Sequence, residues 1–234
     1  MPQKERIRAL FDHIAPDYDR LNRLMSMGLD VSWRRKAIRE LCRDGRPRRV
    51  LDVASGTADF AIDAARQLAD GSRIVGVDIS EQMLAVGCNK VKKAGLQDKV
   101  ELQVADAENL PFDNASFDSV TVAFGVRNFE HLSQGLAEMC RVLRPGGQAV
   151  ILELSYPDNP FLLWCYKLYA VRLLPKVCGW LSGDRDAYHY LPASIMEFPK
   201  PAQFVPMLKE AGFTKVSVRS FTFGVCRMYV AEKE

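Results

Sequence analysis

The sequence predicts an α/β protein: a seven-stranded, mostly parallel sheet with helices on both faces, a helical N-terminal cap and a helical insertion before the last strands. Two observations predict this fold. From residue 48 onward, short runs of β-branched and apolar residues alternate with stretches of helical periodicity, which is typical of a parallel sheet with crossover helices. The last two apolar runs are joined through Gly224, close enough for a hairpin, so the final strand is expected to run antiparallel.

The elements can be assigned in order along the chain. Seven apolar runs are expected to form strands, at residues 48–53, 73–79, 99–106, 116–124, 148–154, 215–223 and 225–233. Three stretches with helical periodicity lie between them, at residues 60–69, 81–94 and 132–143. With 234 residues, 48% of them hydrophobic and 26% charged, the chain fits one large domain with an extension better than two independent cores.

Two segments lie outside this alternation. Residues 1–47 are expected to form a helical N-terminal cap, in which Trp33 lies on the buried face of a helix and Arg34 on another face. Residues 48–234 then form the main domain, with an insertion at about 157–200. Insertions between late strands of an open α/β sheet lie above the carboxyl ends of the strands, where ligands bind.

The insertion contains an apolar run over residues 161–181 with basic residues inside it. The apolar side chains are Trp164, Leu168, Tyr169, Leu173 and Leu174, and the basic ones are Lys167, Arg172 and Lys176. This composition is typical of an amphipathic helix at a membrane interface. A lid helix packed on the core is the competing interpretation, and the sequence leaves both open.

The spacing of the cysteines and the N-terminal residues indicate the cellular compartment. Six cysteines are scattered along the chain with no close pair, which indicates reduced thiols rather than a disulfide framework or a zinc site. The first residues lack the apolar run of a signal peptide, and no stretch is long and apolar enough for a membrane span. The cytoplasm is therefore the expected location.

The net charge of +3 is unevenly distributed, because residues 1–49 hold 13 Lys and Arg against 7 Asp and Glu. Such an excess is typical of a nucleic-acid surface, of contact with an anionic membrane, or of a solvated helical face. The basic residues are not interleaved with the aromatic side chains on which bases stack. We therefore expect no nucleic-acid partner.

Polar residues lie at the carboxyl ends of the first two predicted strands and in the turn after the first. Asp52 lies in the first strand, and a tight turn of small residues with Gly56 and Thr57 follows it; such a turn lets backbone N–H groups approach a ligand closely. The turn has one glycine where the dinucleotide fingerprint needs three, so NAD is a poor match. Asp78 ends the second strand, where a carboxylate can accept both hydroxyls of a ribose.

Asp106 and Ala107 lie at the end of the third apolar run. The Asp106 carboxylate can accept a hydrogen bond from an adenine amino group, and the backbone N–H of Ala107 can donate to a ring nitrogen. Each acid alone is an ordinary strand-end residue. Three of them at successive strands, in order, indicate a nucleoside site.

Together these spacings resemble the S-adenosylmethionine-dependent methyltransferases of the Rossmann-like class, over about residues 48–230. The resemblance implies S-adenosylmethionine as cofactor, with no metal needed. It implies that the turn with Asp52, Gly56 and Thr57 faces the methionine part of the cofactor. In the same way, Asp78 is expected to hold the ribose, and Asp106 with Ala107 is expected to meet the adenine.

Four motifs resemble more specifically the C-methyltransferases of ubiquinone and menaquinone biosynthesis. They are Phe11-Asp12-x-Ile14-Ala15-x-x-Tyr18-Asp19-x-Leu21-Asn22, the run at residues 51–59, Phe124-Gly125-Val126-Arg127-Asn128, and Tyr188-x-Tyr190-Leu191-Pro192-x-Ser194-Ile195. The resemblance implies a polyprenylated hydroquinone as substrate, methylated at a ring carbon, with demethylmenaquinol or the equivalent benzoquinol as candidates. The sequence departs from the family at Ala54 and Ala58, which stand at glycine positions.

This chemistry predicts three catalytic residues. A ring carbon attacks the methyl group best when the neighbouring hydroxyl is ionised, and Arg127 and Asn128 follow the fourth strand, where a guanidinium can stabilise that anion and an amide can orient the ring. Tyr18, on the cap, can pass a proton or fix a water above the ring. The alternative for Arg127 and Asn128 is a loop with a surface salt bridge, and for Tyr18 an aromatic residue that packs helices.

Two other functions stay open from the sequence. A methyltransferase of the same class can act on another small molecule, such as a sterol or a phenolic acceptor, because acceptor choice lies in the variable cap. A non-catalytic nucleoside-binding module can use the same sheet. Besides the hydroquinone, the expected partner is the inner face of the membrane in peripheral contact, and a homodimer is compatible with the sequence.

Overall fold

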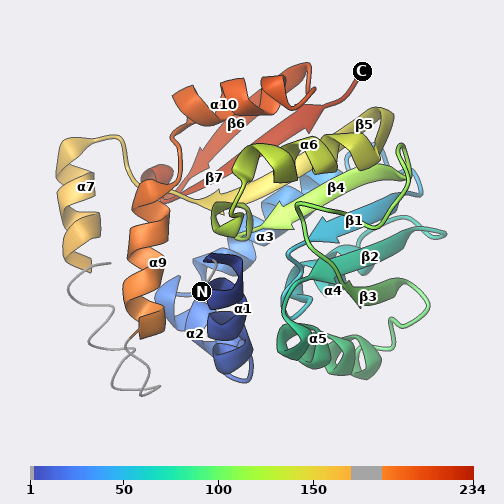
Figure 1. Cartoon of the computed structure of the whole chain (residues 1–234), viewed down its shortest axis with the longest axis horizontal. Helices are drawn as coiled ribbons and strands as arrows, with labels where there is room; N and C mark the ends of the chain where they lie inside the picture. Colours follow the sequence, from blue (N-terminus) through green and yellow to red (C-terminus); the bar gives the residue numbers. More distant parts are fainter. Residues whose placement is uncertain (1–2, 170–185) are drawn as a thin grey trace.

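The computed structural model describes residues 3–169 and 186–234, and it confirms the predicted α/β fold (Figure 1). Seven strands form one sheet in the order β3-β2-β1-β4-β5-β7-β6. The pairs from β3 to β5 are parallel, and β7 pairs antiparallel with both β5 and β6. The strands are β1 (Arg49–Val53), β2 (Arg73–Asp78), β3 (Val100–Val104), β4 (Phe117–Ala123), β5 (Leu143–Leu154), β6 (Lys215–Phe221) and β7 (Cys226–Glu232).

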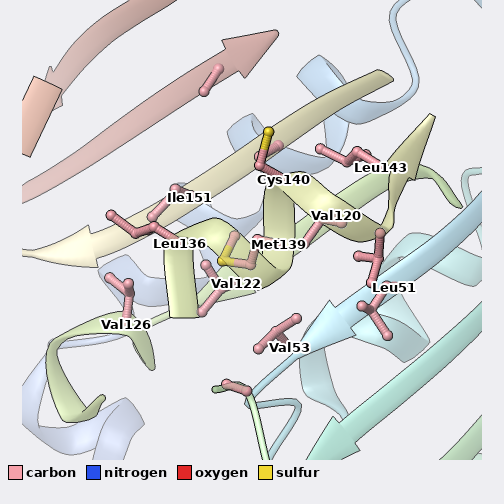
Figure 2. Close-up of a cluster of buried hydrophobic side chains, with 14 of the residues drawn as sticks. Leu51, Val53, Val120, Val122, Val126, Leu136, Met139, Cys140, Leu143 and Ile151 are labelled. Atoms are coloured by element: carbon pink, nitrogen blue, oxygen red, sulfur yellow. The ribbon is translucent and has the colours of Figure 1, made fainter. Parts of the chain in front are cut away.

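Helices cover both faces of the sheet, as the alternation of side chains along each strand requires. On one face lie α6 (Leu132–Val142) and α10 (Pro201–Glu210); on the other lie α3 (Leu29–Leu41), α4 (Asp59–Ala65) and α5 (Glu81–Lys93). Within β5, Ile151 belongs to the first core, whereas Val150 and Leu152 belong to the second. Figure 2 shows the first core, where Leu136 and Met139 of α6 lie over the strands.

The N-terminal segment is helical and consists of α1 (Gln3–Ile14), α2 (Tyr18–Met25) and α3. α3 shares the second core with β5 and β7, and its Trp33 is buried as expected. The expectation that Arg34 faces away from the core is wrong, because its guanidinium is buried in ion pairs with Asp30 at 2.6 Å and Asp59 at 3.2 Å. α1, by contrast, buries only Ile7. The division of the chain at residue 47 stays a prediction.

The insertion contributes α7 (Pro160–Lys167) and α9 (Asp186–Glu197), which lie beyond the end of the sheet next to the N-terminal helices (Figure 1). α7 buries no residue completely, and Phe161, Trp164 and Leu168 along one side of it are exposed. The remaining residues of the predicted interfacial helix, Arg172, Leu173, Leu174 and Lys176, lie outside the described residues. Within the described ranges, no helix has both the length and the apolar character required to cross a membrane.

Candidate active site

The turn after β1 holds an unusual backbone conformation at the carboxyl end of the sheet. Ala54, Gly56 and Ala58 have φ angles of 52°, 55° and 63°. Only glycine adopts this region without strain, and an alanine there is destabilised by roughly 1–2 kcal/mol. The chain therefore keeps a glycine-type turn at both positions where it carries alanine. A Cβ at Gly56 would lie 3.9 Å from the Tyr18 ring, so α2 packs directly over this turn.

The Asp78 carboxylate, at the end of β2, supports the same turn. Its Oδ2 accepts a hydrogen bond from the backbone N–H of Gly56 at 2.9 Å, and its Oδ1 accepts one from the N–H of Ser80 at 2.9 Å. Burial nevertheless raises the pKa of Asp78, although the backbone hydrogen bonds act in the opposite direction. Each oxygen keeps a second lone pair with which it can accept a ligand hydroxyl.

Asp106 follows β3 and contacts the N-terminal helix α1. Its Oδ1 accepts the N–H of Glu108 at 2.9 Å, and its Oδ2 lies 2.6 Å from the Lys4 ammonium. Lys4 also lies 3.2 Å from the buried Glu108 carboxylate. Burial acts to lower the pKa of Lys4, but the hydrogen bonds and charges of the two acids outweigh it and raise the pKa. Lys4 thus holds α1 over the loop that follows β3.

These elements enclose a cavity of about 670 Å³ including its open mouth, which we call cavity A. Its size is in the range of small-molecule sites. It is walled by apolar side chains, including Ile7, Ile79, Met83 and Phe129. Six of the nine predicted site residues line it: Tyr18, Gly56, Asp78, Asp106, Ala107 and Asn128.

The predicted residues Asp52 and Thr57 do not line cavity A but a smaller adjoining one, cavity C, below the turn. Asp52 is 1% exposed, and its carboxylate accepts hydrogen bonds from Ser55 and Thr121 at 2.7 Å each. Burial raises the pKa of Asp52 to about 6. The Thr57 hydroxyl donates a hydrogen bond to the Asp19 carboxylate of α2 and accepts one from the Lys90 ammonium. Asp52 therefore lies beneath the turn and supports it, and Thr57, within the turn, ties it to α2.

Arg127 lies on the other side of Tyr18, in a cavity of about 750 Å³ that we call cavity B. It belongs to the 3₁₀ helix η1 (Val126–Asn128) after β4. Its side chain is only 5% exposed and its Nη1 lies 2.7 Å from Glu153 Oε1, so the alternative of a surface salt bridge is wrong. Burial acts to lower the pKa of Arg127, but the Glu153 carboxylate outweighs it and raises the pKa.

Cavity B is mostly apolar, in contrast to cavity C. Its walls include Met25 of α2, Trp33 of α3, and Tyr166 and Ile195 of the insertion. Burial raises the pKa of Tyr166 to about 12. The neutral phenol therefore dominates, and the walls carry no additional negative charge from it at neutral pH.

Tyr18 and Phe124 line cavities A, B and C together, so these two rings separate the three spaces. Phe124 has a φ of 61°, which is rare for a bulky residue and marks a strained position at this junction. Its ring packs edge-on against Trp33. Burial raises the pKa of Tyr18, which keeps the phenol neutral, and Asn22 hydrogen-bonds it. The Tyr18 hydroxyl is therefore a neutral hydrogen-bonding group at neutral pH.

Asn128 is held from the insertion. The Tyr190 hydroxyl donates to Asn128 Oδ1 at 2.9 Å. The amide oxygen is thus engaged by α9, and the amide N–H₂ is the group that Asn128 can offer to a ligand in cavity A. Arg127 and Asn128 are adjacent in sequence, but Arg127 lines cavity B and Asn128 lines cavity A.

Three residues of this site have no place in the sequence prediction: Lys4, Phe124 as a dividing wall, and Glu153. Glu153 carried a signal, because it is the one charged residue in the otherwise apolar strand at 148–154. An acid inside a buried strand needs a partner. Lys4 carried none, because its partners lie 102 and 104 residues away in the sequence.

The sequence matches one known protein family over nearly its whole length. The model of the ubiE/COQ5 methyltransferase family matches residues 1–233. A demethylmenaquinone methyltransferase of Bacteroides fragilis is 45% identical over 231 residues, which are 99% of this chain and 94% of that protein. A ubiquinone/menaquinone biosynthesis C-methyltransferase of Geobacter sulfurreducens is 47% identical over 98% of this chain and 89% of that protein.

Solved structures show the same fold at low sequence identity. The [4+2]-cyclase SpnF has a TM-score of 0.73 with 17% identity, covering 100% of this chain and 97% of that one. A SAM-dependent methyltransferase from Thermotoga maritima has a TM-score of 0.67 with 18% identity, covering 97% and 99%. At this identity the likeness concerns the fold alone.

Proposed function

The chain belongs to the ubiE/COQ5 methyltransferase family, and from that membership we propose that it methylates a ring carbon of a polyprenyl hydroquinone, demethylmenaquinol being the first candidate and the equivalent benzoquinol the second. It is an S-adenosylmethionine-dependent C-methyltransferase of quinone biosynthesis. The alternative function of a non-catalytic nucleoside-binding module is therefore excluded. The observation that carries the proposal is the pair of adjoining cavities A and B, which share Tyr18 and Phe124 as lining residues.

The donor set of cavity A fits the nucleoside of S-adenosylmethionine. Asp78 would hold the ribose hydroxyls, Asp106 and Ala107 the adenine edge, and the apolar walls the adenine faces. Cavity C, with the Asp52 carboxylate, would take the methionine end. When bound there, the cofactor supplies an electrophilic methyl group on a positively charged sulfur.

The chain's own residues supply position and electrostatics in cavity B. Arg127 would stabilise the ring oxyanion, because a guanidinium fixed in an enclosed site needs no reorganisation as the negative charge develops. Tyr18, neutral and half-buried at the junction, would donate a hydrogen bond to that oxygen or to a water beside it. Asn128 would present its amide N–H₂ from the cofactor side.

The test is an assay of the purified protein with methyl-labelled S-adenosylmethionine and each of the two candidate quinols, kept reduced by dithionite. We expect one label per ring, located on carbon by mass spectrometry, and none with the oxidised quinones, which lack the hydroxyl to ionise. Label on oxygen, or equal labelling of the oxidised forms, would overturn the proposal.

Peripheral membrane contact is part of the same proposal, because the apolar polyprenyl tail of the substrate partitions into a bilayer. The exposed Phe161, Trp164 and Leu168 of α7 support it, because aromatic and aliphatic side chains of this kind insert into an interface. Co-sedimentation with anionic vesicles should fall strongly in Phe161→Ser/Trp164→Ser and stay unchanged in Val218→Ser, a matched exposed site on β6. Equal binding of both variants and the wild type would contradict contact through α7.

A further inference from the structure

Glu153 is a buried acid at the carboxyl end of β5, with 0% of its surface exposed. Its Oε1 accepts hydrogen bonds from Arg127 Nη1 and from the backbone N–H of Leu154, both at 2.7 Å. Its Oε2 accepts one from the backbone N–H of Arg127 at 3.1 Å. A single carboxylate therefore fixes both the side chain and the main chain of Arg127.

Glu153 is not among the residues that line cavity A or cavity B. Arg127 stands between it and the substrate space, with its Nη1 shared between Glu153 and the carbonyl oxygen of Phe124. Whatever Glu153 does for the reaction, it does through Arg127. Its cross-strand neighbour Arg227, 1% exposed, faces the same side of the sheet and holds Asp158 at 2.6 Å.

Glu153 affects the effective charge of the Arg127 guanidinium as well as its position. A lone guanidinium next to cavity B would stabilise a ring oxyanion with a full positive charge, whereas one paired at 2.7 Å with a carboxylate acts with much less. The other ionisable or charged groups around this pair come from every neighbouring element: Tyr18 of α2, Asp30 and Arg34 of α3, Tyr166 of α7, Tyr190 of α9, and Cys226, Arg227 and Tyr229 of β7.

We propose that Glu153 is the positioning residue of the reaction: it holds the Arg127 guanidinium towards cavity B and sets how strongly that cation favours ionisation of the bound hydroquinone. The inference rests on the proposed function, since it takes a ring hydroxyl as the group that Arg127 faces. It assigns the acid in β5 a role in the chemistry without contact to substrate.

The test compares the pH dependence of kcat in Glu153→Gln, Glu153→Asp and the wild type, with Glu40→Gln as control. Glu40 is also an enclosed acid paired with arginine, at 3.2 Å from Arg219, but it lies away from all three cavities. kcat is the informative quantity because its pH profile reports groups in the enzyme–substrate complex. Affinity for S-adenosylhomocysteine, measured by calorimetry, shows that each variant is folded.

In Glu153→Gln we expect kcat to fall about tenfold from misplacement of the guanidinium. The acid limb of the profile should also move about one pH unit lower, because Arg127 is no longer neutralised. Glu153→Asp restores the charge and should return the limb to its wild-type position. Within an Arg127→Gln background, Glu153→Gln should have no further effect on the limb.

A merely structural Glu153 would lower kcat by the same factor at every pH and leave the limb unmoved; that result overturns the inference, as does a full shift in the Arg127→Gln background. If Glu153→Gln does not fold, Glu153→Asp provides the test through kcat: its limb is expected at the wild-type position, but its carboxylate is one methylene shorter and cannot hold the guanidinium in the same place, so a wild-type kcat overturns the inference. Failure of the proposed function is a different outcome, in which the wild type itself does not methylate either quinol.

Discussion

Asp78→Asn is the substitution that most directly tests the nucleoside site. The change keeps the shape of the side chain but replaces one carboxylate oxygen by an N–H₂ group and removes the charge. Asp78 accepts two backbone N–H groups at 2.9 Å and faces cavity A. We expect the variant to lose cofactor affinity while retaining turnover at saturating cofactor, because Asp78 does not line cavity B, the proposed site of the ring.

The magnitude follows from the hydrogen bonds involved. A hydrogen bond to a charged group contributes about 1.5–3 kcal/mol, and the carboxylate would accept two ribose hydroxyls, of which the amide oxygen can still accept one weakly. A loss of about 3 kcal/mol corresponds to roughly a 150-fold higher Kd. One of the two N–H groups of Gly56 and Ser80 also loses its acceptor, which lowers the free energy of unfolding by about 1–3 kcal/mol.

The assay is calorimetric titration with S-adenosylhomocysteine at a temperature where circular dichroism shows the variant folded. Asp118→Asn is the matched control, because Asp118 also accepts a backbone N–H, that of Arg49 at 2.7 Å, yet lines none of cavities A, B and C. A folded Asp78→Asn protein with a Kd within about threefold of the wild type would refute the nucleoside site as described.

Three further outcomes are expected. Arg127→Gln should lower kcat about 100-fold and leave the Kd for S-adenosylhomocysteine within about threefold; comparable losses in both would contradict its role at the ring. Burial raises the pKa of Asp52 to about 6, so the carboxylate that we propose attracts the positively charged cofactor is neutralised as pH falls through that value; titrations from pH 5 to 8 should show affinity for S-adenosylmethionine weakening below about pH 6, and Asp52→Asn should flatten the curve. Phe117→Ala should reduce the free energy of unfolding by about 3–5 kcal/mol in urea titrations, since Phe117 is 0% exposed; a loss below about 1 kcal/mol would contradict its place in the core.

The order of elements could be read from the sequence because it is encoded locally. Strands and helices differ in the spacing of apolar residues, and that spacing needs no knowledge of the rest of the chain. The polar residues at strand ends could be predicted for the same reason, since parallel strands bring their carboxyl ends to one edge. Gly56, Asp78, Asp106 and Ala107 do line one cavity.

The sequence was less informative where a residue's role depends on distant partners. Arg34 lies in a basic run, which predicted exposure, but Asp30 and Asp59 neutralise it in the interior. Arg127 and Asn128 are neighbours in the chain, yet a 3₁₀ turn directs them to different cavities.

The sequence by itself thus determined the α/β architecture, the family and the strand-end residues Gly56, Asp78, Asp106 and Ala107 of cavity A, because each rests on periodicity or on a contiguous motif. Only the tertiary structure decided that Glu153 holds Arg127 across 26 residues and that Tyr190 holds Asn128 across 62. The physical reason is that a buried charge or amide is stable only with a partner, and the fold, rather than local sequence, determines which partner lies within hydrogen-bonding distance.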